Sequence, residues 1–322
     1  MQVHKDIIHL PTFKNSVVTI GTFDGVHLGH RQILSQLKTE AERIDGETVI
    51  ITFHPHPRKI VNSSKPPIHL LNTVEEKIKL LESFQIDHLV IVPFDERFSQ
   101  ITAQDYIEQF LVQKFHPHTI IIGYDHHFGQ GRTGNYILLE EYSAKLHFRL
   151  IEISPHTIEK NTVSSTRIRQ SLLDGDVASA NDLLGYDYCF EGKVIEGNRL
   201  GRELGYPTAN LEIGDKEKLI PANGVYVVEA LLVNDLSLQD ERQIQSRLKG
   251  MMNIGIRPTL SDGKFMIEVN LFDFNENIYG KTLRVFIKKY LRPELKFEGL
   301  ETLKDQIDAD KSVTLQYFAN HF

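Results

Sequence analysis

The stretch Ser16-Val-Val-Thr-Ile-Gly-Thr-Phe-Asp-Gly-Val-His-Leu-Gly-His30 decides the fold of the first half of the chain. It opens with an apolar run of the kind found in buried strands, and a helical pattern begins at His30. Glycines between them let backbone approach a ligand, and a helix N-terminus offers free N–H groups to phosphate. His27 and His30 would add donors for an anionic transition state, unless they are ordinary loop histidines facing solvent. The stretch therefore predicts a phosphate-binding loop between a strand and a helix.

Apolar runs and helical patterns alternate through the first half of the chain. This alternation predicts an α/β fold, a doubly wound parallel sheet with helices on both faces. Ligands of such sheets bind at the carboxyl ends of the strands. The predicted strands cover residues 16–20, 48–53, 88–93, 119–123 and 147–153, and the predicted helices cover 30–44, 74–84, 103–115 and 135–145.

The pattern changes near Gly185. Because strand-like segments follow one another with no helical pattern between them, the second half predicts a small six-stranded antiparallel barrel or sandwich. Two C-terminal helices are predicted after it. The predicted domains are residues 1–186 and 187–322. The strands are expected at 190–195, 208–213, 224–233, 249–256, 265–274 and 283–290, and the helices at 297–308 and 313–320.

Composition excludes several classes of protein. The 322 residues carry 36 Lys and Arg against 43 Asp and Glu, a net charge of −7, which argues against a general binder of nucleic acid or of anionic membranes. No apolar run approaches the roughly 20 residues needed to cross a bilayer. One Cys cannot form an internal disulfide. With no leader-like N-terminus, the chain is expected to be soluble and cytoplasmic.

A second motif, Phe53-His-Pro-His-Pro-Arg58, ends the second predicted strand. Proline restricts the backbone, so the prolines would fix the directions of His54 and His56. The motif is either a ligand-contacting loop or a rigid connector.

A third motif is Val163-Ser-Ser-Thr-Arg-Ile-Arg169. Its hydroxyl groups either cap a helix or converge with helix N–H groups and an Arg on phosphate oxygens. Arg167 and Arg169 are two residues apart, so a regular helix would aim only one of them at the phosphate.

Two glycine patterns are decoys. Gly129-Gln-Gly-Arg-Thr-Gly134 fits the dinucleotide-binding pattern, but the strand before it ends near Gly123 instead of leading directly into it. It is interpreted as a glycine-rich nucleotide-side loop. Gly280-Lys-Thr282 looks like the end of a P-loop, whose earlier glycine would fall at Asn275.

These three motifs resemble the His-x-Gly-His nucleotidyltransferases, and most closely the FMN adenylyltransferase module of bacterial bifunctional FAD synthetases. The resemblance implies a Rossmann-like nucleotidyltransferase domain whose first and third motifs bind ATP phosphates. The residues that it assigns to ATP are Gly21, Thr22, Phe23, Asp24, Gly25, Gly29, Ser164, Ser165, Thr166 and Arg169. Those assigned to a flavin or nucleotide loop are His54, His56, Pro57, Arg58, Asp125, Phe128 and Gly129. In this loop His126 stands where the family has an aromatic residue.

The implied chemistry needs no protein nucleophile. The FMN phosphate attacks the α-phosphorus of ATP, and pyrophosphate leaves. Catalysis would consist of positioning and charge stabilisation, with Mg²⁺ on the phosphate oxygens and His27 and His30 as catalytic residues.

The second half contains Gly192-Lys-Val-Ile-Glu-Gly-Asn-Arg-Leu-Gly-Arg-Glu-Leu-Gly-Tyr-Pro-Thr-Ala-Asn210. Its glycines either expose backbone N–H groups to phosphate or make ordinary turns. Thr208 and Asn210 are two residues apart and share a face on a strand. Their oxygens could hold a hydrated Mg²⁺, or the face is simply solvated.

Glu268 lies in the predicted strand 265–274, on one face with Asn270, Phe272 and Phe274. A carboxylate beside aromatic rings could take the proton of a substrate hydroxyl. The alternative is an exposed Glu at a sheet edge.

The second half resembles the riboflavin kinase module closely, through the run ending at Asn210 and through Gly224-Val-Tyr226, Asn253-Ile-Gly-Ile-Arg-Pro-Thr259 and Glu268. The resemblance implies that Thr208 and Asn210 hold Mg²⁺ and that Glu268 is the catalytic base for the 5′-hydroxyl of riboflavin. Asn270 stands where the family often has His. The residues assigned to ATP or flavin are Gly197, Arg199, Gly201, Arg202, Gly205 and Pro207.

Together the resemblances predict a bifunctional enzyme of FAD synthesis. Its expected partners are riboflavin, FMN, FAD, ATP and ADP, with Mg²⁺ as cofactor, and without nucleic acid or membrane; self-association stays open. Three alternatives are a nucleotidyltransferase for another phosphate ester, a flavin-binding regulator without catalysis, and an NAD-dependent oxidoreductase based on residues 129–134.

Overall fold

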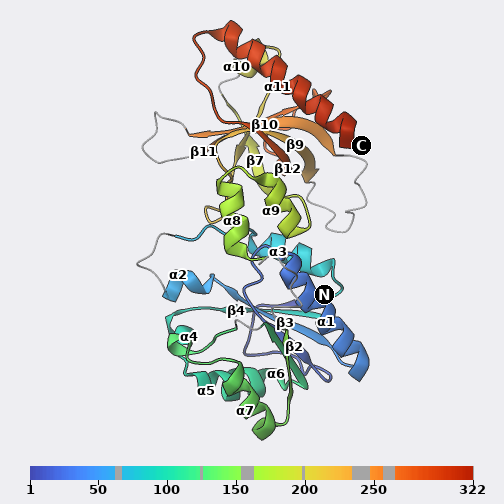
Figure 1. Cartoon of the computed structure of the whole chain (residues 1–322), viewed down its shortest axis with the longest axis vertical. Helices are drawn as coiled ribbons and strands as arrows, with labels where there is room; N and C mark the ends of the chain where they lie inside the picture. The colour runs from blue at the N-terminus through green and yellow to red at the C-terminus, as the bar shows by residue number, and fades with distance from the viewer. Residues whose placement is uncertain are drawn as a thin grey trace. The chain divides into compact units, whose positions relative to one another are not determined.

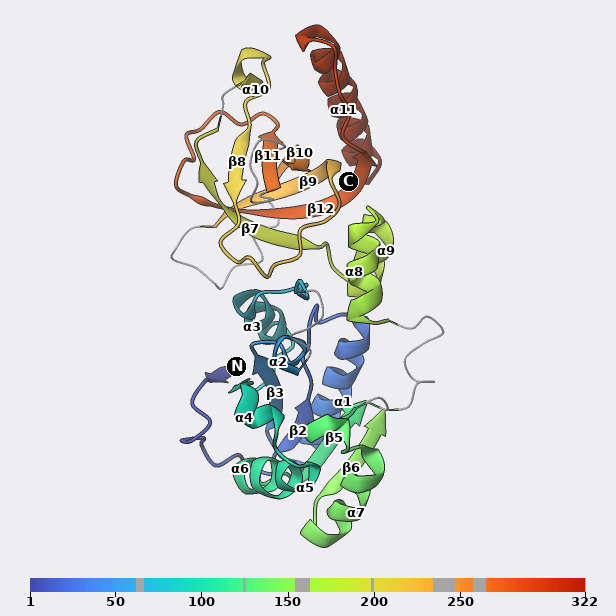
Figure 2. The same cartoon turned by 90° about the vertical axis from the view of Figure 1, so that its left-hand side faces the viewer.

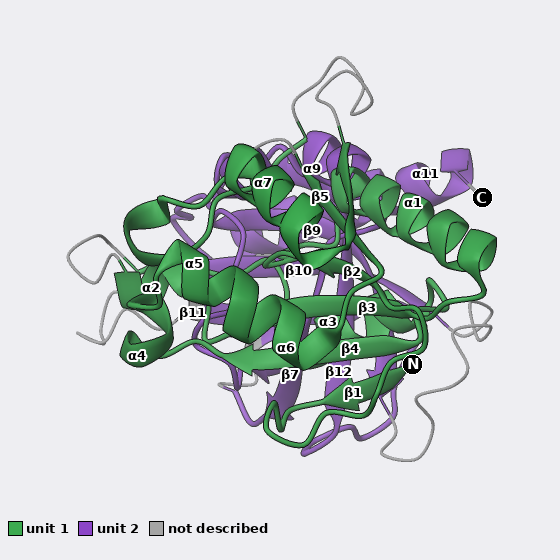
Figure 3. Cartoon of the chain, turned by 90° about the horizontal axis from the view of Figure 1, so that it is seen from below, with its two compact units in different colours: residues 1–165 green, residues 166–322 purple. Residues whose placement is uncertain are grey.

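The computed structural model describes residues 1–61, 67–123, 126–153, 163–197, 200–233, 247–256 and 265–321. Among the predicted site residues, Asp125 and Arg199 lie outside these ranges, as do residues 257–259 of a kinase-like motif. Contacts divide the chain into two compact units, Met1–Ser165 and Thr166–Phe322, which Figure 3 draws in different colours.

A six-stranded parallel sheet forms the centre of the first unit, which confirms the predicted α/β fold. The strand order is β1-β4-β3-β2-β5-β6, so the chain crosses to the other side of β2 after β4, and the switch point of the sheet lies between the neighbouring strands β2 and β5. The strands are β1 Gln2–His4, β2 Val17–Ile20, β3 Thr48–His54, β4 His88–Pro93, β5 Thr119–Gly123 and β6 Arg149–Ile153. Only β1 was not predicted, because three residues are too few to show a periodic pattern.

Helices cover both faces of this sheet (Figure 1). The predicted helix 103–115 is present, but its middle is a π-helical segment between two short α-helical ends. The helical segments of the unit are α1 Leu28–Ile44, α2 Pro57–Val61, α3 Val74–Glu82, α4 Glu96–Ser99, α5 Ala103–Asp105, η1 Tyr106–Val112, α6 Gln113–Phe115, η2 Gln130–Arg132 and α7 Tyr136–Leu146.

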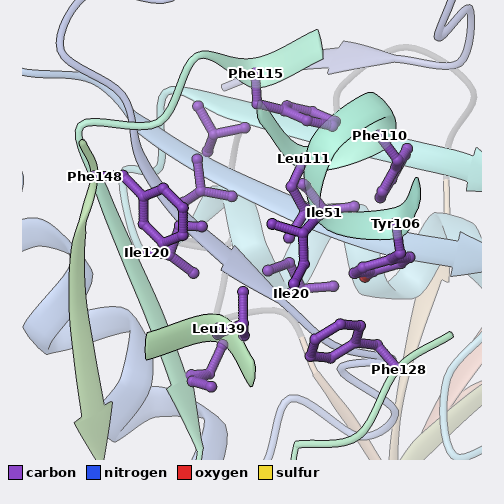
Figure 4. Packing of buried hydrophobic residues seen from close by; sticks show 14 of the residues in the cluster. Ile20, Ile51, Tyr106, Phe110, Leu111, Phe115, Ile120, Phe128, Leu139 and Phe148 are labelled. Carbon is purple, nitrogen blue, oxygen red and sulfur yellow. The ribbon is translucent and has the colours of Figure 1, made fainter. Parts of the chain in front are cut away.

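The core of the first unit consists of two apolar layers, one on each face of the sheet. Side chains of a strand alternate between the faces, so Ile51 of β3 enters one layer and its neighbour Ile50 enters the other. Figure 4 shows the first layer, where η1 and α7 contribute Phe110 and Leu139. The second layer includes Leu34 of α1 and Leu81 of α3. Burial on both faces explains why these strands are continuous apolar runs.

The second unit is a closed antiparallel barrel of six strands in the order β10-β11-β8-β7-β12-β9 (Figure 2). The predicted barrel is therefore confirmed, and the sandwich alternative is excluded. The strands are β7 Cys189–Ile195, β8 Ala209–Glu212, β9 Gly224–Val233, β10 Leu248–Ile256, β11 Phe265–Leu271 and β12 Thr282–Arg292.

Four helices accompany the barrel in the described ranges: α8 Ser165–Leu173, α9 Val177–Leu184, α10 Leu200–Glu203 and α11 Leu300–His321. Three of them differ from the prediction. No helix was predicted at α9. The four-residue α10 lies between β7 and β8, where no helix was expected, because one turn is too short to show helical periodicity. The two predicted C-terminal helices are one continuous helix, α11. No helix in the described ranges has the length and apolar character needed to cross a bilayer.

Shortening a core side chain tests the role of the first layer. Ile51 is fully buried, so Ile51→Ala leaves a cavity and should lower the free energy of unfolding by about 2–5 kcal/mol. Ile8, which is 78% exposed, supplies the matched control Ile8→Ala, whose unfolding should stay within about 0.5 kcal/mol of the parent. Urea titrations followed by circular dichroism would measure both, and equal losses of stability in the two variants would contradict the assignment.

Candidate functional site

The loop after β2 has an unusual backbone. Phe23, Gly25 and Val26 have φ angles of 47°, 89° and 36°, in the left-handed region that glycine tolerates and L side chains rarely adopt. For a β-branched residue such as Val26 this conformation is strained, at a cost on the order of 1–3 kcal/mol. Phe23 and Val26 are both buried, so surrounding structure can hold the loop in this shape.

Asp24 anchors the loop from inside. Its side chain is buried, and its Oδ1 accepts the backbone N–H groups of Leu71 at 2.9 Å and of Asn72 at 3.3 Å. Its backbone carbonyl accepts a hydrogen bond from the Ser165 hydroxyl at 2.8 Å. The structure thus brings Asp24 of the first predicted motif together with Ser165 of the third.

The two histidines of the first motif lie against each other at the start of α1. His27 caps the helix, because its Nδ1 accepts the backbone N–H of His30 at 3.4 Å. The two imidazole rings are stacked, with centroids 3.7 Å apart and planes 15° from parallel. Gly29 leaves space beside them, since a Cβ there would stand 3.2 Å from His27 Nδ1, a tight contact.

His30 is held in its neutral form. Burial, assisted by His27 and by the charge of Lys77, places the pKa of His30 well below its usual value. Its Nδ1 is buried and has no hydrogen-bond partner within the described part of the chain. A neutral imidazole has one donor and one acceptor nitrogen, so His30 keeps a ring nitrogen for a ligand.

Lys77 of α3, which sequence reasoning did not single out, contacts this loop. Its side chain is buried, and its Nζ donates to the Thr22 carbonyl at 2.6 Å. Burial lowers the pKa of Lys77 to about 8, although the charge of Asp24 opposes this shift. The sequence carried a signal, because Lys77 lies four residues before the core residue Leu81 and shares its helix face.

The His-Pro-His-Pro motif lies at the carboxyl end of β3. His54 is exposed and lines a cavity of about 340 Å³ together with Lys5, Glu75 and Pro93. The following residues make a tight connection, as His56 Nδ1 accepts the backbone N–H of Arg58 at 3.2 Å. Pro57 begins α2, the position in a helix that proline favours.

Phe128 and Gly129 pack inside the first unit. The Phe128 ring stacks on Tyr106, with ring centroids 4.9 Å apart. The His126 ring also stacks on Phe128, at a centroid distance of 5.7 Å. Gly129 has φ = 71°, and a Cβ on it would stand 2.7 Å from the backbone of Ala103. Paired backbone hydrogen bonds join Phe128 to Gly134, so the glycine pattern forms a closed turn. It contains only the three-residue 3-10 segment η2 and does not lead from a strand into an α-helix, as a dinucleotide-binding loop would.

The remaining residues of the third motif lie along α8. Ser164 precedes the helix, and Thr166 and Arg169 belong to the second compact unit. Arg169 is half-buried whereas Arg167 is exposed, so the helix does give the two arginines different surroundings.

The second candidate site is built on two neighbouring strands of the barrel. Asn210 of β8 and Glu268 of β11 are direct cross-strand partners, so their side chains share one face of the sheet. The adjacent pair, Leu211 and Ile267, is buried in the core. The structure thus brings the predicted metal-binding amide next to the predicted catalytic carboxylate.

Glycines let the loop before β8 fold onto these residues. A Cβ on Gly197 would stand 2.1 Å from the Asn210 side-chain nitrogen, and one on Gly201 would stand 2.4 Å from the Tyr206 carbonyl oxygen. The loop closes through a hydrogen bond of 2.7 Å from the Tyr206 N–H to the Gly201 carbonyl. Gly205 turns the chain there with φ = 85°.

A cavity of about 380 Å³ lies beside this loop, lined by Gly205–Pro207, by the end of β11 and by Lys311 of α11. Asn270 donates to the Pro207 carbonyl at 2.7 Å and so ties the loop to β11. The Lys311 ammonium lies 5.6 Å from the ring centroids of both Tyr206 and Phe272. Sequence reasoning missed Tyr206 and Lys311, because α11 is remote from the loop in the chain.

The donor set of the barrel site fits Mg²⁺ that is shared with a nucleotide. Thr208 and Asn210 offer a hydroxyl and an amide oxygen, and the Glu268 carboxylate lies opposite Asn210. No cluster of three or more His, Cys, Asp or Glu side chains able to hold a metal occurs in the described ranges. Such a small set of oxygens suits Mg²⁺, which keeps water and phosphate oxygens as its other ligands.

Comparisons with known proteins cover both units. A family model described as FAD synthetase matches residues 10–167, and one described as riboflavin kinase matches residues 184–318. The bifunctional riboflavin kinase/FMN adenylyltransferase of Buchnera aphidicola subsp. Schizaphis graminum is 39% identical over 308 residues, which is 94% of each chain. The chain belongs to the family of bifunctional riboflavin kinase/FMN adenylyltransferases. The family member from Escherichia coli K12 is 34% identical, over 94% of this chain and 92% of its own.

A solved structure shares the whole fold. It is a crystal structure described as a macrolide-efflux protein from Streptococcus pneumoniae, with a TM-score of 0.84 and 31% identity. The match covers 97% of this chain and 98% of the other. The arrangement of a parallel-sheet unit followed by a barrel is therefore common to both chains.

The contact between Gly197 and Asn210 gives a testable prediction. In Gly197→Ala the added methyl group displaces the Asn210 side chain, and kinase activity should fall at least about tenfold, as expected for a misplaced site group. Gly214→Ala is the matched control, because a Cβ at Gly214 meets nothing within 4 Å. Separate assays with riboflavin and with supplied FMN would measure the effect; a Gly197→Ala protein with parental kinase activity would refute this reading of the loop.

Proposed function

We propose that this chain makes FAD from riboflavin in two ATP-dependent steps at separate sites. The first step transfers the terminal phosphoryl group of ATP to the 5′-hydroxyl of riboflavin and yields FMN and ADP. The second joins the AMP part of another ATP to FMN and yields FAD and pyrophosphate. The observation that carries the proposal is that bifunctional relatives match this chain along both units.

In the kinase step, Glu268 is the base that takes the proton of the riboflavin 5′-hydroxyl. Its register opposite Asn210 supports this role, because a base must lie close to the phosphoryl group that the hydroxyl attacks. Thr208 and Asn210 are the proposed Mg²⁺ ligands, and bound Mg²⁺ would neutralise charge on the phosphate oxygens. Gly197, Gly201 and the turn at 205–207 would position the nucleotide and flavin, together with Arg199 and Arg202.

In the adenylylation step, the strained loop 21–25 and Gly29 surround the ATP phosphates. His27 and His30 donate to oxygens that gain charge when the FMN phosphate attacks the α-phosphorus. The unpartnered Nδ1 of His30 supports this role, since a neutral ring can present an N–H without bringing a buried positive charge. Ser164–Thr166 and Arg169 would complete the phosphate site, and the loops at 54–58 and 125–129 would contact the flavin or the base.

The functional division of the chain is proposed at residues 186 and 187. This boundary keeps the whole Ser-Ser-Thr-x-x-Arg motif with the adenylyltransferase, although Thr166 and Arg169 make their contacts in the second compact unit. We also propose that the enzyme works in the reducing cytoplasm, where its one thiol, Cys189, stays reduced.

Two substitutions should separate the activities. Glu268→Gln should abolish FMN formation from riboflavin and leave the adenylylation of supplied FMN unchanged. His30→Ala should do the reverse and slow adenylylation roughly 10²–10³-fold, the effect of losing one oxyanion donor. Thin-layer separation of the fluorescent flavins, after incubation with ATP and Mg²⁺, scores both steps. A folded variant that lost both activities would argue against separate sites, and a wild-type chain that formed neither flavin would favour the hypothesis of a flavin-binding regulator without catalysis.

Removing metal ligands should act on one step only. Thr208→Ala removes a proposed ligand, so the Mg²⁺ concentration for half-maximal kinase activity should rise by about tenfold or more, on the scale of one lost ligand interaction of 1–2 kcal/mol. The Mg²⁺ requirement of adenylylation, measured on the same preparation with supplied FMN, is the internal control. Equal shifts in the two requirements would contradict the assignment of Thr208.

A further inference from the structure

We propose that Lys77 is a positioning residue for adenylylation, whose ammonium holds the Thr22 carbonyl inward so that the next N–H, that of Phe23, faces the ATP phosphates. Neither the motifs of the first unit nor the resemblance assigns a role to this residue. The inference rests on the proposed function of the loop 21–25, and its test is arranged so that the two can fail separately.

The Thr22 carbonyl is the focus of a small buried network. It accepts a hydrogen bond from Lys77 Nζ at 2.6 Å and another from the Thr52 hydroxyl at 3.1 Å. Lys77 Nζ and Thr52 Oγ1 are themselves 3.5 Å apart. Both side chains are buried, with 8% and 2% of their surfaces exposed, so neither contact is diluted by solvent. One carbonyl oxygen is therefore fixed from α3 and from β3 at once.

Fixing this carbonyl also fixes the amide that follows it. The Thr22–Phe23 peptide is trans and planar, so its C=O and N–H point in opposite directions. With the carbonyl directed at Lys77, the Phe23 N–H is directed to the opposite side of the loop. Among the described residues no acceptor for this N–H occurs. An outward N–H in a loop of this kind is the type of donor that binds phosphate oxygens.

The loop needs such restraint because its backbone is strained. Phe23 and Val26 hold positive φ angles, and strained residues persist only where surrounding contacts over-determine them. Asp24 is tied by Leu71 N–H and by the Ser165 hydroxyl, but both of these contacts act after the Thr22–Phe23 peptide. Lys77 and Thr52 are the contacts that act on that peptide itself.

Rotation of this peptide would reverse its effect on a nucleotide. Without the inward hydrogen bonds, the Thr22 carbonyl is free to turn outward and take the place of the Phe23 N–H. A carbonyl oxygen directed at a phosphate repels it, whereas an N–H attracts it. The structure also retains a buried ammonium whose desolvation is costly, and an apolar side chain would fill the same space without that cost. That cost is consistent with a role beyond packing.

The experiment compares Lys77→Met, which keeps the length of the side chain but has no donor, with Lys79→Met on the same helix. In Lys77→Met the value of kcat/KM for ATP in FMN adenylylation should fall roughly 10–100-fold, because one phosphate donor is misdirected. The KM for FMN should not change, and phosphorylation of riboflavin by the same preparation should keep the parental rate. Lys79→Met should match the parent in all of these measurements.

Two further measurements separate positioning from a general loss of structure. Lys77→Ala should regain activity when propylamine is added, since the amine can enter the space of the side chain and donate to Thr22. Thr52→Val should lower kcat/KM for ATP less than Lys77→Met does, and the double variant should be no worse than Lys77→Met alone, because both side chains act on one carbonyl. Thr52→Val and the rescue of Lys77→Ala serve as the test if Lys77→Met does not fold.

The outcomes distinguish the inference from the function on which it rests. A parent chain that adenylylates FMN, beside a Lys77→Met variant with parental kcat/KM for ATP, would overturn the inference alone. A Lys77→Met variant with a raised KM for FMN and a comparable loss of kinase activity would also overturn it, by showing a merely structural role. A parent chain that cannot adenylylate FMN would overturn the proposed function and the inference with it.

Discussion

The first unit must hold a strained loop after β2, and several of its buried polar contacts serve this purpose. Two side chains at positive φ, Phe23 and Val26, are unfavourable in any isolated peptide, so the loop exists only because neighbouring elements hold it. The Asp24 carboxylate accepts hydrogen bonds from the backbone N–H groups of residues 71 and 72, and the Lys77 ammonium donates one to the Thr22 carbonyl. The parallel sheet makes this possible, because it brings the carboxyl ends of the neighbouring strands β2 and β3 side by side. The helix α3 supplies Lys77 to the loop that follows β2.

The barrel positions the groups of its candidate site in a different way. Its site is regular strand, in which the register places Asn210 and Glu268 opposite each other without strain. The loop that covers them requires close packing, and glycine permits it by leaving room for the Asn210 amide at Gly197 and for the Tyr206 carbonyl at Gly201. In the first unit, side chains hold an awkward backbone. In the second, an absent side chain lets the backbone approach an ordinary strand.

The sequence predicted what repeats or alternates, and missed what depends on contacts between distant segments. Strands such as 88–93 and 224–233 were placed to the residue, because burial on one or both faces leaves a pattern of apolar positions. The single-turn helix α10 and the three-residue strand β1 leave no such pattern. The nearness of Asn210 to Glu268 follows from barrel register, which spacing alone cannot supply. Lys77 was missed because a lysine in an amphipathic helix is ordinarily a solvated residue, and its place on the helix face of Leu81 was outweighed by that expectation.

The net charge of −7 acquires a physical meaning from these two sites. A protein that handles ATP twice needs positive potential at its phosphates, yet few cations are needed if the donors are neutral and fixed in place. In the proposed adenylylation site, loop N–H groups and a neutral His30 would be such donors, and in the proposed kinase site the barrel would offer oxygens to Mg²⁺ bound with the nucleotide. Lys77 then matters less as a charge that meets the nucleotide than as the group that keeps a backbone dipole pointed at it. An acidic chain can serve polyanionic substrates in this way, because the fields that act on the phosphates are short-range and local.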